Sequence, residues 1–346
     1  MSAQLRVSRS ALRANYHHLE ASTAGPVGAV VKADAYGLGA HTVVACLIEA
    51  GCSTFFVATA AEALALRQHY ESITLYVFAG ADHRTAPLLA EQRIQPLLNT
   101  PAQIESWRRL CAGAPCGLQI DTGMARLGFD WRDPAAVDST GLELSLLSTH
   151  FACADEPDAR LNVQQIERFR PWVEAFSKVP VSLGNSAAGL ASAIPTFGLT
   201  RAGIVLYGGN PFAEQPNPMR PVVCLDARIL QLREVLAGDS AGYGATWIAP
   251  EGRTLAVLGM GYADGLPRSL SNSGTVIVDA QPCPIVGRVS MDAVQVDVTG
   301  RALSEGDWVQ LIGPQQSLDA FAAQQQTIPY EVLTRLGPRV ERRYVD

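Results

Sequence analysis

Short apolar runs alternate with stretches of helical periodicity through the first two thirds of the chain. Eight of these runs have the length and the flanking turn residues typical of buried strands. They are Val27–Lys32, Thr54–Ala58, Ile73–Phe78, Gln95–Leu98, Gly117–Asp121, Leu142–His150, Val181–Gly184 and Thr200–Leu206. Strands that alternate with helices predict a parallel sheet, and eight such units in about 210 residues fit a closed, TIM-like (β/α)8 barrel. An open, doubly wound sheet is the alternative, although no G-x-G-x-x-G motif follows the first run.

Helical patterns lie between most of these runs, and two of them carry clear start signals. Thr59-Ala-Ala-Glu62 has the form of a capping box, in which a hydroxyl at the N-cap is answered by a carboxylate three residues later. Thr100-Pro101-Ala-Gln103 has the same form with proline at the first helical position. We therefore expect helices to begin directly after Thr59 and Thr100.

The pattern changes near Asn210-Pro211, where Pro216, Pro218 and Pro221 follow closely. Beyond this predicted linker the apolar runs shorten and alternate with polar residues, which is typical of antiparallel strands. These runs are Leu225–Leu236, Thr254–Met260, Gly274–Asp279, Ala293–Val298, Asp307–Ile312 and Val340–Val345, with short helices around Ser317–Gln326 and Tyr330–Leu336. We expect a barrel domain over residues 1–215 and a mainly antiparallel β domain over residues 216–346, with roughly the first ten residues able to pair with the second domain.

Composition limits the classes of function. The chain has 346 residues, 48% of them hydrophobic and 17% charged, so it can fill a large core. Its net charge of −6 and the lack of a Lys/Arg-rich run argue against nucleic acid as the main partner.

Three further observations concern location. No apolar core of a signal peptide follows Arg6 and Arg9, and the longest uncharged stretch, 179–200, is broken by prolines and glycines. The seven cysteines are scattered without a C-x-x-C motif, which favours a reducing compartment and no zinc or other structural metal. We therefore expect a cytoplasmic protein with no membrane partner.

Candidate chemistry begins with Lys32, which ends the first apolar run. A lysine at a strand end usually extends its amine to water, but desolvation lowers a lysine pKa and a partly neutral amine can form a Schiff base. In a barrel, the carboxyl ends of the other strands meet at the same mouth. The residues found at those ends are Tyr36, Arg126, His150, Asn185, Ser186, Arg201, Gly203 and Ile204.

This set suits an anionic ligand beside a reactive lysine. It holds arginines, a histidine and hydroxyls but no pair of carboxylates, which argues against glycoside hydrolysis. Loops after the seventh and eighth strands of such barrels often bind phosphate, and here they carry Asn185-Ser186 and Gly203-Ile204. Glycine at position 203 lets backbone N–H groups approach an anion closely.

Nine motifs in chain order carry a resemblance to a known family. They are Val30-Val31-Lys32-Ala33-Asp34-Ala35-Tyr36-Gly37, Asp121-Thr-Gly-Met-x-Arg126-Leu-Gly128, Ser148-Thr-His150-Phe151, Gly184-Asn185-Ser186, Arg201-x-Gly203-Ile204-x-x-Tyr207-Gly208, Tyr243-Gly244-Ala-Thr246, Gly261-Tyr262-Ala-Asp264-Gly265, Gly287-Arg288-Val-Ser-Met291-Asp292 and Pro329-Tyr330-Glu331. In this order the motifs resemble alanine racemase, and the resemblance runs from about residue 5 to the C-terminus.

The resemblance implies a cofactor, pyridoxal 5′-phosphate (PLP), bound covalently by Lys32. Its phosphate would be held by Tyr36, Ser186, Tyr330 and the backbone of Gly203 and Ile204, with Asn185 beside them. Arg201 would face the pyridine nitrogen, where a permanently charged guanidinium disfavours protonation of the ring.

The resemblance also implies two bases, one on each face of the substrate. Lys32 would exchange the proton of D-alanine and Tyr243 that of L-alanine, with His150, bonded to Arg201, assisting Tyr243. In this family the tyrosine comes from the second subunit, so the active form would be a head-to-tail homodimer in which Met291 and Asp292 also cross the interface. Arg126 would bind the substrate carboxylate. Positions that match an access channel are Tyr262, Asp155, Arg268, Arg288 and Ile328.

One position departs from the family pattern. Many members carry a lysine two residues before Asp121, and its carbamate positions the arginine that corresponds to Arg126. Here the residue is Gln119, which is neutral and cannot be carbamylated. Arg126 would then be held by the amide oxygen of Gln119 or by a bound anion such as chloride, and we favour chloride because a buried guanidinium without an anion is costly.

The expected function is therefore racemisation of alanine, which either supplies D-alanine for peptidoglycan or degrades it. A racemase of broader specificity is the nearest alternative. A PLP-dependent decarboxylase of the same barrel type is less favoured, because the chain is short for one. A non-catalytic PLP-binding homeostasis protein would share the barrel alone, so the residues after the linker argue against it.

Overall fold

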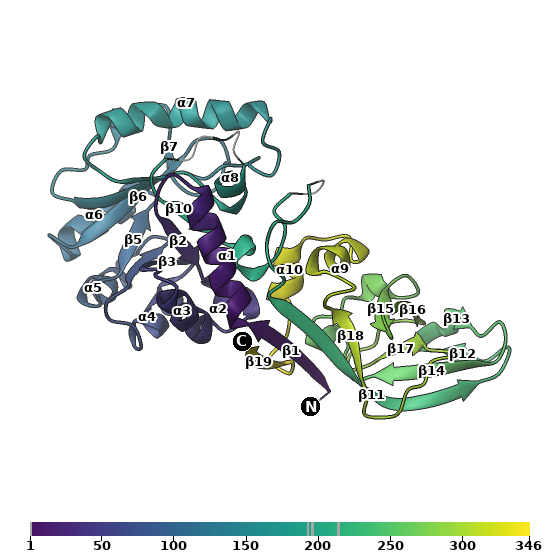
Figure 1. The fold of residues 1–346 in the computed structure, drawn as a ribbon. Coiled ribbons are helices and arrows are strands. Elements are labelled where there is room, and N and C mark those ends of the chain that lie inside the picture. The colour runs from purple at the N-terminus through teal and green to yellow at the C-terminus, as the bar shows by residue number, and fades with distance from the viewer. Residues whose placement is uncertain (1, 192–193, 195–196, 213–214) are drawn as a thin grey trace. The chain divides into compact units, whose positions relative to one another are not determined.

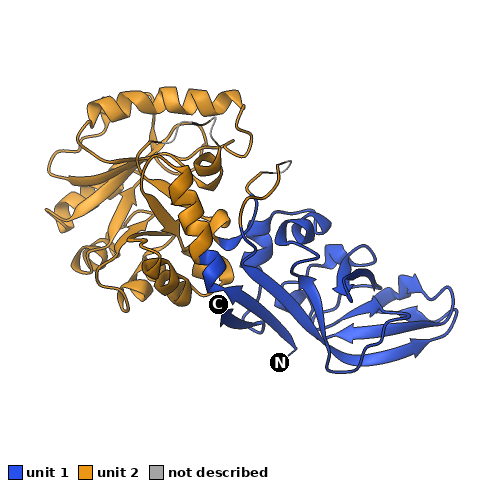
Figure 2. Ribbon diagram, in the orientation of Figure 1, with its two compact units in different colours: residues 1–12, 207–210, 220–346 blue, residues 13–206, 211–219 orange. Residues whose placement is uncertain are grey.

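The computed structural model describes residues 2–191, 194, 197–212 and 215–346. The chain divides into two compact units (Figure 2). The β unit comprises residues 1–12, 207–210 and 220–346, and the barrel unit comprises residues 13–206 and 211–219. The predicted linker is thus shared between the units, and its residues 213 and 214 lie outside the described residues.

Eight parallel strands form the barrel unit, in the order β10-β2-β3-β4-β5-β6-β8-β9 (Figure 1). Their bounds are β2 Val27–Val30, β3 Thr54–Val57, β4 Thr74–Val77, β5 Gln95–Leu98, β6 Pro115–Asp121, β8 Glu143–Ser148, β9 Val181–Ser182 and β10 Thr200–Ala202, and a short β7, Phe129–Asp130, pairs with β6. The two end strands are also connected, because Leu199 N–H donates to the Val181 carbonyl at 2.8 Å and Arg201 N–H to the Gly184 carbonyl at 2.9 Å. This near-closed parallel barrel confirms the predicted fold class of the first part of the chain.

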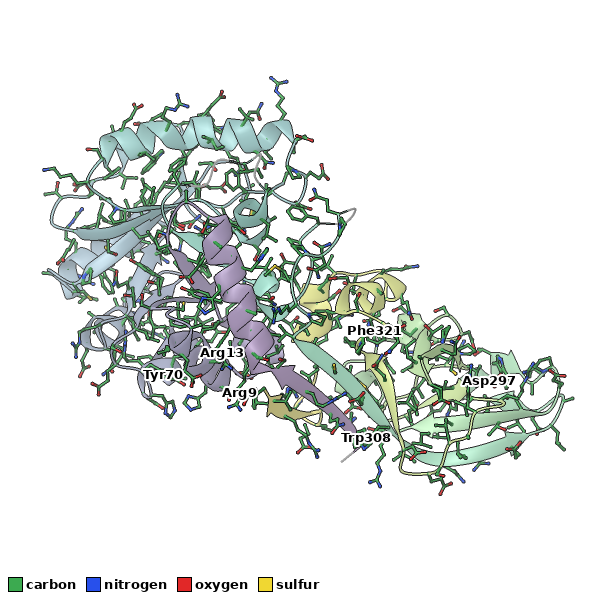
Figure 3. All side chains as sticks on the ribbon, in the orientation of Figure 1. Arg9, Arg13, Tyr70, Asp297, Trp308 and Phe321 are labelled. Atoms are coloured by element: carbon green, nitrogen blue, oxygen red, sulfur yellow. The ribbon has the colours of Figure 1, made fainter. Side chains whose placement is uncertain are left out.

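Helices connect most of these strands. They are α1 Arg9–Ser22, α2 Lys32–Gly37, α3 Ala40–Glu49, α4 Ala60–Arg67, α5 Ala86–Glu91, α6 Pro101–Leu110, α7 Arg160–Ala175 and α8 Ser186–Leu190, with 3-10 turns η1 Pro134–Ala136 and η2 Ile204–Tyr207. The predicted start signals are confirmed, since Thr59 and Glu62 form the capping box of α4 and the Thr100 side chain accepts from Gln103 N–H at the start of α6. Arg13 of α1, labelled in Figure 3, forms an ion pair with Glu49 of α3 at 3.2 Å.

Several predicted strands were too long. The strand that was predicted to end at Lys32 ends at Val30, and Lys32 opens the turn α2. The run Thr200–Leu206 contains a strand of only three residues, after which Ile204–Tyr207 turns as η2. Ile204 and Leu206 are completely buried although they lie outside the ladder. Hydrophobicity therefore overestimates strand length where the connection after a strand is itself buried.

The β unit holds a sheet in the order β14-β17-β16-β15-β18-β11-β1-β19, and β11 also pairs with β14, which closes six of its strands into a ring. Every pairing is antiparallel except that of β1 with β19, which confirms the mainly antiparallel prediction. The strands are β1 Ala3–Ser8, β11 Val223–Val235, β14 Arg253–Leu258, β15 Thr275–Val278, β16 Gln281–Val286, β17 Val294–Asp297, β18 Trp308–Ile312 and β19 Glu341–Val345, and a separate pair comprises β12 Ser240–Ala241 and β13 Trp247–Ile248. The helical elements are η3 Tyr243–Ala245, η4 Tyr262–Asp264, η5 Arg268–Leu270, α9 Leu318–Gln324 and α10 Pro329–Thr334.

Four strands of this unit lie outside the predicted apolar runs, namely β1, β12, β13 and β16, although roughly the first ten residues were expected to be able to pair with this domain. Strand β16 contains Pro282 and Pro284, which lack the N–H that a central strand normally donates. Strand β1 is short and lies at the start of the chain, and it is held by partners more than two hundred residues away, Val223–Ala227 and Glu341–Val345. Next to these strands, Arg9 forms an ion pair with Asp346 at 2.9 Å (Figure 3).

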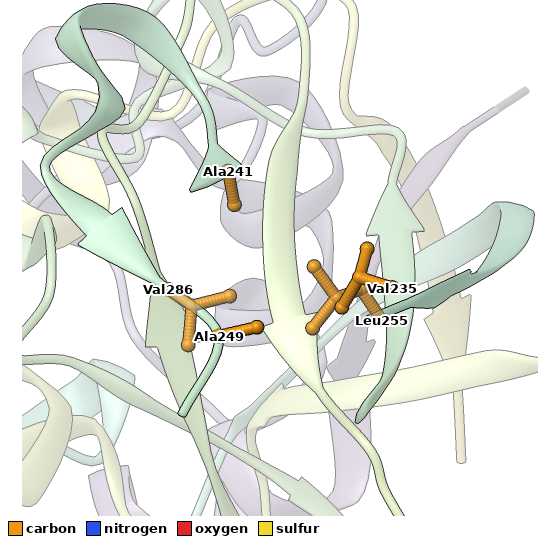
Figure 4. Packing of buried hydrophobic residues seen from close by; sticks show 5 residues of the cluster. All are labelled: Val235, Ala241, Ala249, Leu255 and Val286. Atoms are coloured by element: carbon orange, nitrogen blue, oxygen red, sulfur yellow. The ribbon is translucent and has the colours of Figure 1, made fainter. Parts of the chain in front are cut away.

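A small hydrophobic cluster packs at one end of the β unit (Figure 4). It comprises Val235, Ala241, Ala249, Leu255 and Val286, with Trp247 packed against it. The cluster joins strands β11, β14 and β16 to the β12–β13 pair, and so it supports the segment that carries Tyr243 between them. Among the helices of the described residues, none combines the length and the apolar character that a membrane crossing requires.

Candidate active site

The segment directly after β2 has an unusual backbone. Four consecutive residues, Ala33 to Tyr36, have φ between 51° and 58° and form a left-handed turn. This conformation costs an L-residue roughly 1–2 kcal/mol, so the surroundings must impose it. Side chains supply part of that support, because Glu62 accepts from Ala33 N–H at 2.7 Å and Asp34 accepts from Ala40 N–H at 2.6 Å. The turn fixes Lys32 and Tyr36 at the carboxyl end of β2.

The Lys32 amine lies 5.7 Å from the centre of the Phe78 ring. Burial lowers the pKa of Lys32, the positive charge of Arg126 lowers it further, and Glu62 acts in the opposite direction. A lowered pKa increases the fraction of neutral amine near pH 7, which is the nucleophilic and basic form. The sequence contains one other lysine, Lys178, and it is exposed.

Arg201 lies in β10 and is 3% exposed. Its guanidinium donates to the carbonyl of Thr149 at 2.6 Å, to that of Ser182 at 3.0 Å and to the Ser182 hydroxyl. Among the described residues no carboxylate pairs with it, and burial together with the charge of Arg126 lowers the pKa of Arg201 to about 10. The site therefore keeps a buried positive charge that only dipoles stabilise.

His150 follows β8 and contacts the same guanidinium. Its Nδ1 atom lies 3.0 Å from Nη2 of Arg201. Because a guanidinium only donates, Nδ1 must accept, which leaves the ring proton on Nε2. Burial and the positive charges of Arg201, Arg126 and Lys32 hold the pKa of His150 well below its usual value, so the ring is neutral near pH 7.

Three residues from separate elements enclose a small polar cradle. Gly203 N–H donates to the Ser186 hydroxyl at 2.8 Å. A Cβ atom at position 203 would lie 2.5 Å from the Tyr36 hydroxyl oxygen and 3.6 Å from that of Ser186. Only glycine leaves this space open, and the hydroxyls of Tyr36 and Ser186 border it. Asn185 caps the adjoining helix α8 by accepting from Ala188 N–H at 3.0 Å.

The loop after β6 presents Arg126. The Asp121 carboxylate organises this loop by accepting from the N–H groups of Gly123, Met124 and Arg126 at 2.8–2.9 Å. Burial would raise the pKa of Asp121, but these hydrogen bonds hold it below its usual value, so the carboxylate stays ionised. Gln119 donates to the Ile120 carbonyl at 3.5 Å, and no hydrogen bond joins it to Arg126.

The remaining predicted site residues belong to the β unit. Tyr243, Tyr262 and Arg268, with Val289, line a pocket of about 280 Å³. Backbone bonds from Tyr262 to Ser290 and from Ala263 to Met291, each 3.0 Å, tie the Tyr262 and Met291 segments together. Tyr243, Tyr262, Met291 and Ile328 all have exposed side chains, and Tyr243 is 71% exposed.

The predicted residues thus fall into two groups. In the barrel unit Arg201 lies in β10, and the others follow the carboxyl ends of strands, namely Lys32, Tyr36, Arg126, His150, Asn185, Ser186, Gly203 and Ile204. Asp155 is exposed in the loop after β8. Those of the β unit are Tyr243, Tyr262, Arg268, Arg288, Met291, Ile328 and Tyr330. Arg288 is exposed next to Tyr243, since a Cβ on Gly244 would lie 2.7 Å from its guanidinium, and Tyr330 is partly buried in the first turn of α10.

Sequence reasoning missed three contributors to the barrel group. Phe78 lies next to the Lys32 amine, Glu62 holds the left-handed turn, and Ser182 binds Arg201. Glu62 had a sequence signal only for its capping role. No pattern in the sequence marks the second oxygen of its carboxylate as the acceptor for Ala33, because that contact depends on how α4 packs beside α2.

Comparison with known proteins identifies the relatives of this chain. A family model described as "Alanine racemase, N-terminal domain" matches residues 7–211, and one described as "Alanine racemase, C-terminal domain" matches residues 222–344. The chain is 43% identical to an alanine racemase of Acidiphilium cryptum, over 98% of this chain and 97% of that protein. It is 42% identical to a protein of Agrobacterium fabrum named "Alanine racemase, catabolic", over 99% of this chain and 92% of that protein.

A solved structure is similarly close. The alanine racemase of Bartonella henselae, described as having covalently bound pyridoxal phosphate, superposes with a TM-score of 0.94 at 37% sequence identity. The superposition covers all of both chains. The similarity therefore extends through the barrel unit and the β unit alike.

The lowered pKa of Lys32 generates a test that needs no activity. At a pH below the pKa that Lys32 has in the folded protein, its amine is charged in both the folded and the unfolded state, and burying the charge destabilises the fold. This cost fades as the pH rises toward 10.5, the usual pKa of a lysine. We expect Lys32→Met to raise the urea midpoint of the ligand-free protein near pH 7, with a gain that shrinks at higher pH. Lys178→Met, at the exposed lysine, should leave the midpoint unchanged throughout. If both variants shifted the urea midpoint equally, the assignment of Lys32 as a buried amine with a lowered pKa would be contradicted.

Proposed function

The chain belongs to the alanine racemase family and is an amino-acid isomerase, and we propose that it interconverts L-alanine and D-alanine by a two-base mechanism that uses PLP. The match of the family's C-terminal domain to residues 222–344 supports an enzyme over a non-catalytic PLP-binding protein, which would need the barrel alone. A two-base mechanism needs a cofactor site and two bases. We propose that the predicted site residues of the barrel unit and those of the β unit together supply them.

The residues of the barrel unit fit PLP. Lys32 offers a partly desolvated amine for the covalent bond, and the cradle of Tyr36, Ser186, Gly203 and Ile204 offers hydroxyls and N–H groups for a phosphate. Asn185 and Tyr330 complete the proposed set. When bound, PLP supplies an electron sink that makes the α-proton of the amino acid acidic enough to remove.

Arg201 is the observation that carries this proposal. It is a buried guanidinium with no carboxylate partner among the described residues, held by carbonyls and by His150. Facing a pyridine nitrogen, such a charge disfavours a second positive charge on the ring. We propose that Arg201 thereby restrains the electron sink, so that the deprotonated carbon is returned quickly to a proton and side reactions are limited.

Lys32 is the proposed base on one face of the substrate. Its lowered pKa suits a group that must accept a proton near pH 7 and return it. As a free amine, Lys32 would exchange the α-proton of D-alanine. Phe78 and the left-handed turn restrict where the amine can go.

Tyr243 of the partner subunit is the proposed base on the other face and exchanges the α-proton of L-alanine. Its side chain is 71% exposed in a single chain, which leaves it available to a second copy. A free phenol has a pKa of about 10 and needs help to ionise. His150 can give that help, since Arg201 occupies Nδ1 and leaves the Nε2 proton to donate to a phenolate oxygen.

The other residues would bind and admit the substrate. Arg126 would hold the alanine carboxylate, and the partner's Met291 would close one side of the site. The access channel would be lined by Tyr262, Asp155, Arg268, Arg288 and Ile328. In this arrangement residues 1–215 bind PLP, and residues 216–346 supply Tyr243 and Met291 to the other subunit of a head-to-tail homodimer.

We place the reaction in D-alanine metabolism in the cytoplasm, either as a source of D-alanine for peptidoglycan or as a step in its breakdown. One relative, from Agrobacterium fabrum, is named catabolic.

We also propose that an anion such as chloride replaces the missing carbamate beside Arg126. Three cations, Lys32, Arg126 and Arg201, are close enough for Arg126 to lower the pKa of the other two. Gln119 contributes no charge against them, and its amide is directed to the Ile120 carbonyl. A small anion near Arg126 would offset this accumulation of positive charge.

The covalent bond to PLP can be mapped without measuring activity. Reduction with borohydride fixes a lysine-bound cofactor, and peptide mass mapping then locates it. We expect the label on the peptide containing Lys32 and its loss, together with the visible absorbance, in Lys32→Ala. The matched variant Lys178→Ala should keep both, and a label on Lys178 in the unchanged protein would disprove the assignment.

Shared active sites can be tested by mixing two inactive variants. Lys32→Ala and Tyr243→Phe should each lose most racemase activity as pure proteins. Refolded together in equal amounts, half of the dimers pair unlike chains, and each mixed dimer has one intact site. We expect recovery of about one quarter of the wild-type activity. No recovery from a mixture that forms dimers normally would show that each site is built from one chain.

The anion proposal predicts halide dependence. Activity in a halide-free buffer should rise when chloride or bromide is added, and crystals grown with bromide should show anomalous scattering beside Arg126. A halide-free site in which the Gln119 oxygen binds the Arg126 guanidinium would refute it. Gln119→Lys is the informative variant, since a carbamylated lysine would restore the charge and remove the halide dependence.

A further inference from the structure

Gln165 is a completely buried glutamine on α7, and no part of the proposed mechanism uses it. Its side-chain oxygen accepts from Ala152 N–H at 2.9 Å. Its side-chain nitrogen donates to the His150 carbonyl at 2.9 Å and to the Thr122 hydroxyl at 3.0 Å. The amide thus makes three hydrogen bonds, and each goes to one of the two loops that carry proposed site residues.

The first loop is the one that presents Arg126. Thr122 directly follows Asp121, whose carboxylate holds the N–H groups of this loop. From the same face of α7, Arg168 donates to the Thr122 carbonyl at 2.8 Å. The Arg168 guanidinium also packs against the next residue, Gly123, where a Cβ would lie 2.8 Å from it. Two side chains of helix α7 therefore donate hydrogen bonds to Thr122, one to its hydroxyl and one to its carbonyl.

The second loop carries His150. The Thr122 hydroxyl lies 2.7 Å from that of Thr149, and both residues are buried. The Thr122 hydroxyl therefore accepts from Gln165 and also shares a hydrogen bond with the Thr149 hydroxyl, in which either oxygen can donate. The Thr149 carbonyl in turn accepts from Arg201, and the His150 ring accepts from the same nitrogen.

We propose that Gln165 is a positioning residue for racemisation, because it fixes the loop of Arg126 to the segment after β8 that carries His150, whose ring contacts Arg201. This inference rests on the proposed function, in which Arg126 binds the substrate carboxylate and His150 assists the second base. A buried amide whose oxygen and both N–H groups are hydrogen-bonded holds both loops in place, and an error of about 1 Å in such a site can reduce a rate about a hundredfold.

Gln165→Met is the main test, and the neighbouring Gln164→Met is its matched control. Gln164 lies on the same helix and makes no side-chain hydrogen bond to the described residues. We expect Gln165→Met to lower kcat/KM for alanine by roughly ten- to a hundredfold. Gln164→Met should stay within about twofold, the scale of a surface change that removes no contact. Equal activity of the two variants would overturn the inference.

A second variant separates positioning from packing. In Gln165→Glu the carboxyl can donate one hydrogen bond while protonated and none once ionised, and burial beside a carbonyl raises its pKa. Activity relative to wild type should therefore fall as pH rises, whereas the ratio for Gln165→Met should not depend on pH. A pH-independent ratio for Gln165→Glu would mean that the donated bonds do not matter for the reaction.

Thr122→Val removes the hydrogen bond that Gln165 donates to the Arg126 loop, together with the bond between the hydroxyls of Thr122 and Thr149. Because it loosens the Arg126 loop but leaves His150 and Ala152 held, it should raise KM for alanine with little change in kcat, whereas Gln165→Met should change both. If neither variant raised KM, the role assigned to the Thr122 contact would be overturned.

Amide hydrogen exchange tests, independently of activity, whether Gln165 holds the two loops. Gln165→Met should speed exchange in residues 121–128 and 150–154 together, and Thr122→Val in 121–128 alone. Unchanged exchange in both segments would overturn the inference even if the wild-type protein is a racemase. A wild-type protein without racemase activity would refute the proposed function, while the exchange pattern would still decide whether Gln165 fixes the two loops.

Discussion

The buried guanidinium of Arg201 is the constraint on which the rest of the barrel site depends. A charge that is 3% exposed and has no carboxylate partner among the described residues must be stabilised by oriented dipoles. The carbonyls of Thr149 and Ser182 supply them, and these come from the ends of two neighbouring strands, β8 and β9. The charge therefore fixes the ends of three adjacent strands, and it also sets the protonation of His150.

The positive charges of this site act on one another. Arg126 lowers the pKa of Lys32, His150 and Arg201, and of these three only Lys32 would exchange protons with substrate in the proposed mechanism. A neutral histidine and a partly neutral lysine follow from the same cause, an excess of positive charge in a place where water is scarce. Such a site favours anions, which agrees with a cofactor phosphate, a substrate carboxylate and a small anion beside Arg126.

The supporting residues are less obvious than the reactive ones, and they explain how the geometry is held. Glu62 supports the strained turn after Lys32, Asp121 shapes the loop of Arg126, and Gln165 joins that loop to the segment of His150. Each of them uses side-chain oxygen or nitrogen atoms on backbone groups of a loop. Loops built this way can be rigid without contributing to the sheet.

The sequence by itself determined the alternation of strands and helices, the change to an antiparallel domain, and the family, because apolar periodicity and motif order are local properties of the chain. It also located Lys32, His150 and Arg201 near strand ends. It did not determine that the first strand stops at Val30, because a buried left-handed turn is as apolar as a strand. Strand β16 was hidden by its prolines. Only the tertiary structure decided that Gln165 contacts the loops of Arg126 and His150, since its partners lie up to 43 residues away and a glutamine on an amphipathic helix gives no sign of what its amide will contact.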